Sequence, residues 1–238
     1  METMSTNSSS SEKQRYEPII VIPGQTSKNR IPGYYPDILT KEKARNNNYI
    51  LHACKLLKSY QNNKGINALV LDGKQMRTTH TLQKLGDKLK KIIIVEYSNE
   101  TYEYMLNKKR TNVYCYNCHI KEYIDNLNDP RTNVVYFDTM GSFFTSKKSY
   151  GADIIINEFL RQSICDEIIL AATFCLRNPS SQLYEIQQNK ILLLLDKIFI
   201  INGFSYKSLV PKNNLRYKGQ KAFGKSMIFV LFYLRREQ

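Results

Sequence analysis

Short apolar runs alternate with helical patterns along most of this chain. The first run, Asn67–Asp72, passes through a polar turn into the helical pattern Thr78–Leu89. The same unit of strand, turn and helix recurs, with strands predicted at Lys91–Glu96, Asn112–Asn117, Asn133–Asp138 and Glu167–Phe174. This alternation predicts an α/β fold in which helices cover a mostly parallel sheet.

Further helices are predicted around these strands. One begins at Thr40 and carries a one-sided stripe made of Asn46, Ile50, Cys54 and Leu57. The others cover Glu100–Lys109, Ile120–Leu127, Ala152–Arg161 and Gln182–Leu195. Two long strands, Ile200–Val210 and Lys225–Arg235, close the chain, and a link this short allows only an antiparallel hairpin.

Residues 1–40 differ in composition from the domain predicted at 41–238. Met1–Lys13 is rich in Ser, Thr, Asn and Glu, so it cannot bury enough apolar area to offset the entropy lost on ordering, and we expect it to be disordered. Tyr16–Thr40 holds two apolar patches punctuated by prolines and is predicted to be an extended arm. Its aromatic side chains either pack on the domain or cover the ends of the strands.

The chain is strongly basic. Its formal net charge is +14 and its pI is about 9.5, which favours nucleic acid over small acidic molecules as a partner. A lysine bias is the alternative, because many Lys, Asn, Ile and Tyr residues without any Trp are typical of an AT-rich genome such as that of a large DNA virus. The hydrophobic content of 42% is ordinary for a globular protein.

The five cysteines are predicted to be reduced thiols. Their number is odd, and several lie within apolar runs. No apolar run approaches the roughly 20 residues that span a bilayer, so we expect no membrane partner and a cytoplasmic or nuclear location, or a viral factory if the protein is viral. The pattern Cys115-x-x-Cys118-His119 resembles half of a zinc or haem site, but no second pair accompanies it, so no metal site is predicted.

Polar residues stand where the predicted strands end: Asp72, Glu96, His119 and Asp138. In a parallel sheet these ends share one edge, beyond which ligands bind. Together with the terminal antiparallel pair, this arrangement resembles the class I S-adenosylmethionine-dependent methyltransferases. The resemblance implies a Rossmann-like, doubly wound, mostly parallel sheet that ends in an antiparallel C-terminal hairpin, with S-adenosylmethionine as cofactor.

The resemblance also implies which residues contact the cofactor. Glu96 and its neighbour Tyr97 take the ribose position, where a carboxylate can accept hydrogen bonds from both hydroxyl groups. Asp72, Gly73 and Lys74 take the position of the methionine part, and His119 stands near the adenine. Asp138 is also expected among the residues that contact the cofactor. Two departures are visible: the family's run of glycines is replaced by Gly73–Arg77, and His119 replaces an acid.

The acceptor side is implied by Asp138, Gly141 and Ser142. Their spacing is similar to that of the transfer-RNA guanine-N2 methyltransferases, which favours RNA over DNA and a base amine as acceptor. Asp138 would accept a hydrogen bond from the amine, beside Ser142, and align its lone pair with the methyl group. Aromatic side chains in the following loop either stack on a base or pack in the core.

Basic side chains cluster in two further places and predict a phosphate track. They are Lys147 and Lys148 in the loop after Asp138, and Lys212, Arg216, Lys218 and Lys221 in the C-terminal hairpin. A merely solvated hairpin is the alternative.

Two classes of function therefore stand. The first is a nucleic-acid methyltransferase. The second is a protein of the same fold without catalysis, which binds nucleic acid, a different partner protein or a second copy of itself in a homodimer. A methyltransferase of small molecules or proteins is third, because the basic charge disfavours it.

Overall fold

The computed structural model describes residues 41–108, 111–127, 129–138, 143–144, 151–176, 181–211, 216–218 and 226–237, and for 181–183, 216–218 and 226 it describes the backbone alone. The predicted N-terminal arm therefore lies outside the described residues. Along the chain the elements are α1 (Lys41–Cys54), α2 (Lys58–Gln61), β1 (Ile66–Val70), α3 (Arg77–Leu82), the 3-10 helix η1 (Gln83–Lys88), β2 (Leu89–Val95), α4 (Asn99–Leu106), β3 (Val113–Tyr116), α5 (Ile120–Asp125), β4 (Val134–Asp138), α6 (Ala152–Gln162), β5 (Glu167–Leu176), α7 (Ser181–Ile201), β6 (Phe204–Ser208), β7 (Arg216–Lys218) and β8 (Ser226–Arg236).

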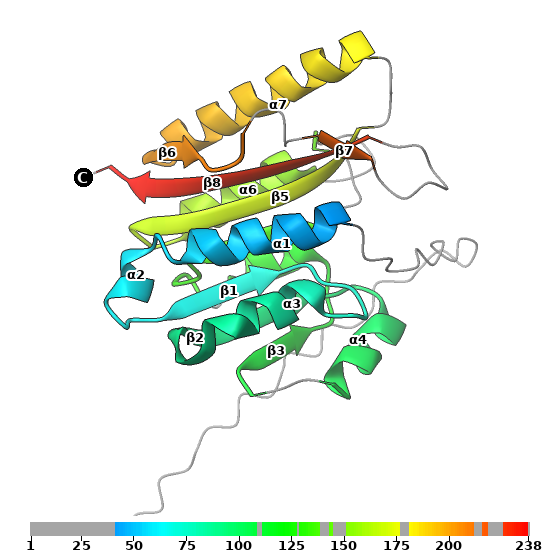
Figure 1. Ribbon diagram of the computed structural model, residues 1–238, viewed down its shortest axis with the longest axis vertical. Coiled ribbons are helices and arrows are strands. Elements are labelled where there is room, and N and C mark those ends of the chain that lie inside the picture. Colours follow the sequence, from blue (N-terminus) through cyan, green and yellow to red (C-terminus); the bar gives the residue numbers. More distant parts are fainter. Residues whose placement is uncertain are drawn as a thin grey trace, which may run out of the picture.

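These elements form a sheet with helices on both faces (Figure 1). The strands lie in the order β3-β2-β1-β4-β5-β8-β6, and β7 pairs with one end of β8. The strands β1 to β5 pair parallel to their neighbours, whereas β8 is antiparallel to β5, β6 and β7. The predicted Rossmann-like sheet with an antiparallel C-terminal pair is confirmed. The sequence did not indicate that β8 is inserted between β5 and β6.

Each face of the sheet has its own helices. In Figure 1, α1 and α3 lie in front of the sheet and α6 behind it, and α6 contacts both α5 and α7. Alternate residues of β4 face the two layers. The Phe137 ring meets Phe159 of α6 at a centroid distance of 6.4 Å, while the Tyr136 ring meets Phe229 of β8 at 6.2 Å. Every residue of β5 is buried, which fits a central strand covered on both faces.

The helix predicted at Thr78–Leu89 is shorter than expected. It consists of α3 followed by η1, because Gly86 adopts φ 58° and ψ −134°, which no helix accommodates. The second strand consequently begins at Leu89, whose buried side chain joins the core.

The prediction for residues 200–203 was wrong, because α7 continues to Ile201 and β6 begins only at Phe204. From Ile191 onward each turn of α7 buries an apolar side chain, namely Ile191, Leu195 and Ile198, so this apolar run has helical rather than strand periodicity. Gly203 ends the helix with φ 74°, and its N–H donates to the Ile200 carbonyl oxygen at 3.0 Å. None of the helices in the described part of the chain is long and apolar enough to cross a membrane.

Candidate functional site

The site is set by the strand order. From β1 the chain first builds β2 and β3 on one side, and then returns to build β4 and β5 on the other side. In open α/β sheets, ligands bind beyond the carboxyl ends of the strands where the order reverses, which here is between β1 and β4. Asp72 follows β1 by two residues, and Asp138 is the last residue of β4. The fold therefore places two carboxylates, both predicted from the sequence, at the two sides of this switch point.

Asp72 holds the start of α3. One oxygen, Oδ2, accepts a hydrogen bond from the Thr79 N–H at 2.8 Å, and Oδ1 accepts one from the Thr78 N–H at 3.4 Å. It thus replaces the missing side-chain cap of α3, whose preceding residue Met76 has a left-handed backbone with φ 47°. Burial raises the pKa of Asp72 from 3.8 to about 6 against the lowering effect of these N–H groups, and the nearby charge of Asp138 adds to the rise.

Asp138 contacts the first helix. Its Oδ2 lies 3.5 Å from Lys43 Nζ of α1, and both side chains are mostly buried. Its Oδ1 is buried and has no hydrogen-bond partner among the described residues. Asn46, one helical turn further along α1, is fully buried with neither side-chain polar atom bonded within the described part of the chain. A buried polar atom left unpaired costs about 1–3 kcal/mol, so these atoms suit a polar ligand group.

Sequence reasoning missed Lys43 and assigned Asn46 to the apolar stripe of the first helix. The signal for Asn46 was present, because an amide at a core-facing position of an amphipathic helix needs a polar partner. No local signal in the sequence indicated Lys43, because only the packing of α1 over the sheet brings it to Asp138.

Glu96 directly follows β2, as predicted. Its N–H donates to the Tyr116 carbonyl oxygen at 3.0 Å, which continues the ladder to β3, and its Oε1 accepts a hydrogen bond from the Ser98 N–H at 2.7 Å. Burial raises its pKa, while the N–H groups of Ser98 and Tyr97 act in the opposite direction. The side chain is only partly buried, so a held carboxylate is presented at the edge of the sheet; Tyr97 beside it is 64% exposed.

Lys74 pairs with an acid of α4. Its Nζ forms an ion pair with Glu100 and lies 5.9 Å from the centre of the Tyr104 ring. The loop after β1 is thereby tied to the helix that follows β2, with Gly73 exposed between them. The predicted contact of Lys74 with the methionine part of the cofactor would have to compete with Glu100.

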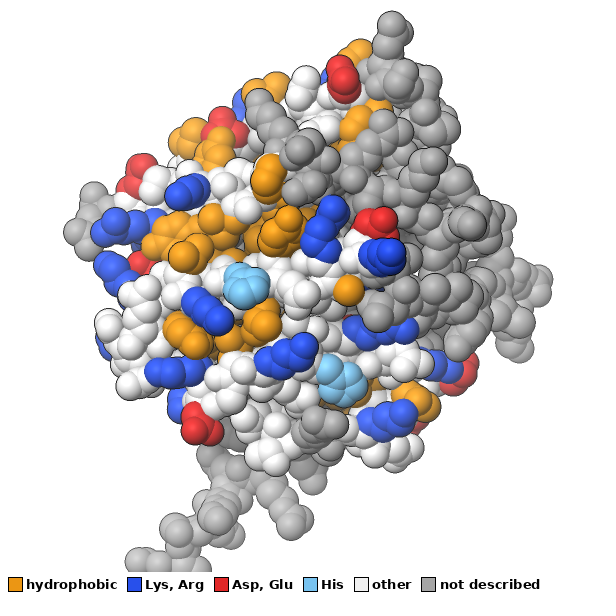
Figure 2. All heavy atoms as spheres, viewed as in Figure 1, with side chains coloured by type: hydrophobic (Ala, Val, Ile, Leu, Met, Phe, Trp, Pro, Cys, Tyr) orange, Lys and Arg blue, Asp and Glu red, His pale blue; other side chains and the backbone are white. Residues whose placement is uncertain are grey.

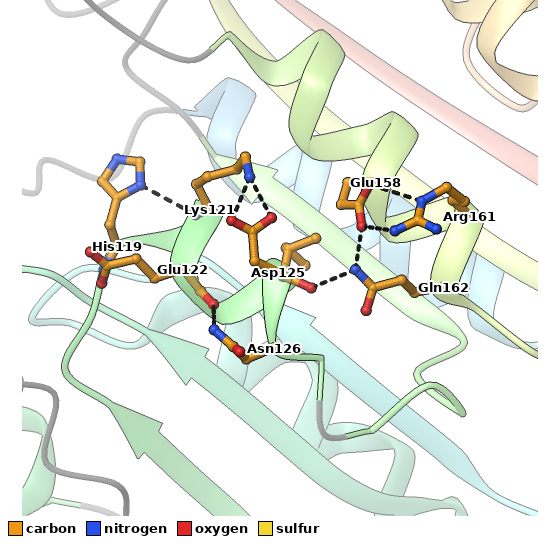
Figure 3. Close-up of polar contacts among 9 residues, drawn as sticks. His119, Lys121, Glu122, Asp125, Asn126, Glu158, Arg161 and Gln162 are labelled. Atoms are coloured by element: carbon orange, nitrogen blue, oxygen red, sulfur yellow. Dashed lines mark hydrogen bonds and ion pairs between the residues drawn. The ribbon is translucent and has the colours of Figure 1, made fainter.

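His119 caps α5, as Figure 3 shows. Its Nδ1 accepts a hydrogen bond from the Lys121 N–H at 3.2 Å, and its own N–H donates to Glu122 Oε2 at 3.2 Å, which makes a reciprocal capping box. Gln162 of α6, also labelled in Figure 3, donates to the Ile124 carbonyl oxygen at 2.9 Å, which joins α6 to α5. The structure thus gives His119 a structural role that the sequence did not indicate; its contact with adenine stays a prediction.

Several predicted residues lie outside the described residues: Ser142, Lys147, Lys148, Lys212 and Lys221. Arg216 and Lys218 belong to β7, of which the backbone alone is described.

Phe143, one of the aromatic residues in the loop after Asp138, packs in the core. It is buried, and its ring meets Phe174 of β5 at a centroid distance of 4.8 Å. Cys115 and Cys118 are free thiols, and burial raises the pKa of Cys118 to about 11.

Comparison with known proteins finds similarity in structure but not in sequence. No protein-family model and no curated protein matches the chain. Among solved structures, the YcgJ protein from Bacillus subtilis is 10% identical, with a TM-score of 0.53 over 82% of this chain and 99% of that one. TYW2 of M. jannaschii, solved in complex with AdoMet, is 14% identical, with a TM-score of 0.50 over 84% of this chain and 78% of that one. At these identities the likeness shows a shared fold.

Proposed function

We propose that this chain is an S-adenosylmethionine-dependent methyltransferase that acts on nucleic acid, on RNA rather than DNA, at a base amine. The observation that carries the proposal is the pair Asp72 and Asp138 at the switch point, with Glu96 on the next strand end. The shared fold with TYW2, which was solved with AdoMet, supports the choice of cofactor. The net charge of +14 supports a polyanionic substrate.

The residues present fit this cofactor. Glu96 is a partly buried carboxylate with one oxygen held by the Ser98 N–H, which leaves it oriented to accept hydrogen bonds from ribose hydroxyl groups. Gly73 follows Asp72 in the loop at the switch point, where the methionine part would lie. When bound, S-adenosylmethionine supplies an activated methyl group.

Asp138 is the residue that would position the acceptor. Its Oδ1 has no partner within the described residues, while Lys43 fixes Oδ2 from the other side at 3.5 Å. The unpaired oxygen would accept a hydrogen bond from the exocyclic amine and so align the lone pair of the nitrogen with the methyl group. Ser142 is proposed to assist on the same side.

A specific observation favours a second candidate, a protein of this fold without catalysis. Both oxygens of Asp72 already accept hydrogen bonds from α3, and Lys74 is paired with Glu100. Both residues are therefore engaged within the protein, in a loop where the related enzymes carry glycines. Such a protein would bind nucleic acid or a partner without transferring a methyl group.

The test is calorimetric titration of S-adenosylmethionine and S-adenosylhomocysteine into the full chain. We expect micromolar binding that Glu96→Ala weakens at least about tenfold, since a charge-assisted pair of hydrogen bonds is lost. The matched control is Glu103→Ala, which removes the same charge from an exposed position of α4. Transfer of labelled methyl groups to RNA and DNA pools then identifies the substrate. Absence of heat for either ligand would overturn the proposal in favour of the second candidate.

A further inference from the structure

The outward side of α1 carries one stripe of basic and polar side chains. It consists of Lys41, Arg45, Asn48, His52 and, in the turn directly after the helix, Lys55. These positions recur every three or four residues, so they share one side of the helix, opposite the side that α1 buries. The stripe contains no acidic and no apolar residue, and Arg45 is its only partly buried member.

The neighbouring helix continues this surface. Arg77 and His80 of α3 and Lys84 of η1 are spaced by three and four residues, and His80 and Lys84 are exposed. The two helices are joined by a hydrogen bond of 3.3 Å from Thr78 Oγ1 to Asn47 Oδ1. We call the eight residues of both helices the basic ridge.

Acids are few within the two segments that carry the ridge. Residues 41–64 contain six Lys or Arg and one acid, and residues 72–91 contain six Lys or Arg and two acids, which is a combined net charge of +9. Four of these lysines form ion pairs with acids elsewhere in the chain, and none of the four belongs to the ridge: Lys43, Lys58, Lys74 and Lys91. Figure 2 shows the result on the face formed by α1 and α3, where Lys and Arg side chains are spread widely and acidic side chains are sparse. A local positive field of this kind concentrates polyanions.

The basic ridge begins beside the candidate site. Lys43 lies within the first turn of α1 and contacts Asp138 at 3.5 Å, so that turn stands at the carboxyl end of β4. From there the stripe from Lys41 to Lys55 extends about 20 Å along the helix, at 1.5 Å per residue. A strand whose base lies at Asp138 could therefore place several successive phosphates on the ridge.

We propose that the basic ridge is a phosphate-binding track for the nucleic-acid substrate. Lys and Arg side chains neutralise phosphates, and Asn and His add hydrogen bonds to phosphate or sugar. An anionic membrane is disfavoured, because helices that bind membranes carry a continuous apolar side beside their basic one, whereas the stripe from Lys41 to Lys55 contains no apolar residue and the exposed Leu56 follows it as a single side chain. The choice of nucleic acid as the ligand of the basic ridge rests on the proposed function. The positive charge of the ridge is an observation that does not depend on that proposal.

The test is fluorescence anisotropy with a labelled single-stranded RNA, and DNA of the same sequence, titrated with the full chain at salt concentrations from about 30 to about 300 mM, a range of one decade. The ridge variant is Lys41→Gln/Lys55→Gln/Lys84→Gln, which changes three exposed side chains. The charge-matched control is Lys190→Gln/Lys197→Gln/Lys207→Gln, also three exposed lysines, on α7 and β6. A third variant, Lys212→Gln/Lys218→Gln/Lys221→Gln, examines the hairpin favoured by the sequence.

We expect the ridge variant to lower the salt slope of log K by about 2, because each lost phosphate contact lowers the slope by about 0.7 on a single strand, and so to bind about a hundredfold more weakly at 0.1 M salt. The control should keep its slope. Equal losses in ridge and control variants, or a loss confined to the hairpin variant, would overturn the proposal. So would binding to vesicles of anionic phospholipid, but not to RNA or DNA, that the ridge variant abolishes.

These outcomes are separable from failure of the proposed function. The anisotropy measurement needs neither cofactor nor catalysis. Binding through the ridge without any methyl transfer would support the track and contradict the enzyme. Binding of S-adenosylmethionine without any affinity for nucleic acid would contradict the track and direct the search to other acceptors.

Discussion

Lys43 Nζ of α1 lies 3.5 Å from Asp138 Oδ2 at the end of β4, and this contact joins the first helix to the carboxyl end of a central strand. The side chains of both residues are about one quarter exposed or less, at 26% and 19%. An ion pair at such a site is only partly screened by water, and removing one partner leaves the other charge poorly solvated. The pair therefore couples the placement of α1 to the acceptor side of the site.

Lys43→Gln should lower the free energy of unfolding by about 1 kcal/mol, because Asp138 then keeps its charge without a cation. In the double variant with Asp138→Asn, part of that loss should be recovered, with a coupling of about 0.5–1 kcal/mol. Urea denaturation of the four proteins of this cycle measures the coupling. Strictly additive losses would mean that the two side chains do not interact in solution.

Asp72 should make stability depend on pH in the sense opposite to most carboxylates. Its pKa is raised from 3.8 to about 6, so the folded state holds the proton more tightly than the unfolded state. Its contribution is then fully present below pH 3.8 and is lost as the pH rises through about 6, by up to about 3 kcal/mol. Asp72→Asn removes this titration.

The measurement is the difference in unfolding free energy between the natural chain and Asp72→Asn, taken by denaturation at several pH values between 4 and 7. Carboxylates that do not interact with Asp72 cancel in that difference, whereas Asp138, whose charge acts on Asp72, contributes to it. As the pH rises, the natural chain should lose stability relative to Asp72→Asn. A difference that does not change with pH would show that the pKa of Asp72 is near its ordinary value.

His119 should tolerate Asn but not Ala. An Ala at this position removes the side-chain acceptor that binds the Lys121 N–H and should cost about 1 kcal/mol of stability, whereas Asn retains a cap. Thermal unfolding compares the two variants. If capping is the whole role of His119, His119→Asn should bind S-adenosylhomocysteine within about twofold of the natural chain; a tenfold loss, about 1.4 kcal/mol, would instead indicate contact with the adenine.

The alternating strands and helices were readable from the sequence because a buried strand and an amphipathic helix each leave a local hydrophobic pattern. For the same reason Asp72, Glu96 and Asp138 were found, since each follows an apolar run. The end of α7 was misjudged because the run through Ile198 and Ile201 suits either periodicity, although Gly203 was a visible stop signal.

The sequence by itself determined the order of the strands along the chain, the acids at their ends and the excess of positive charge. The tertiary structure alone decided which strands are neighbours, and so that β1 and β4 form the switch point and that β8 lies between β5 and β6. It also decided that Lys43 reaches Asp138, that Asp72 caps α3, and that the basic residues of α1 and α3 share one face. The contacts of Lys43 with Asp138 and of α1 with α3 join residues far apart in the chain and arise from tertiary packing, which leaves no trace in local periodicity. The cap of α3 by Asp72 is local, but it depends on the backbone of the intervening turn, where Met76 is left-handed.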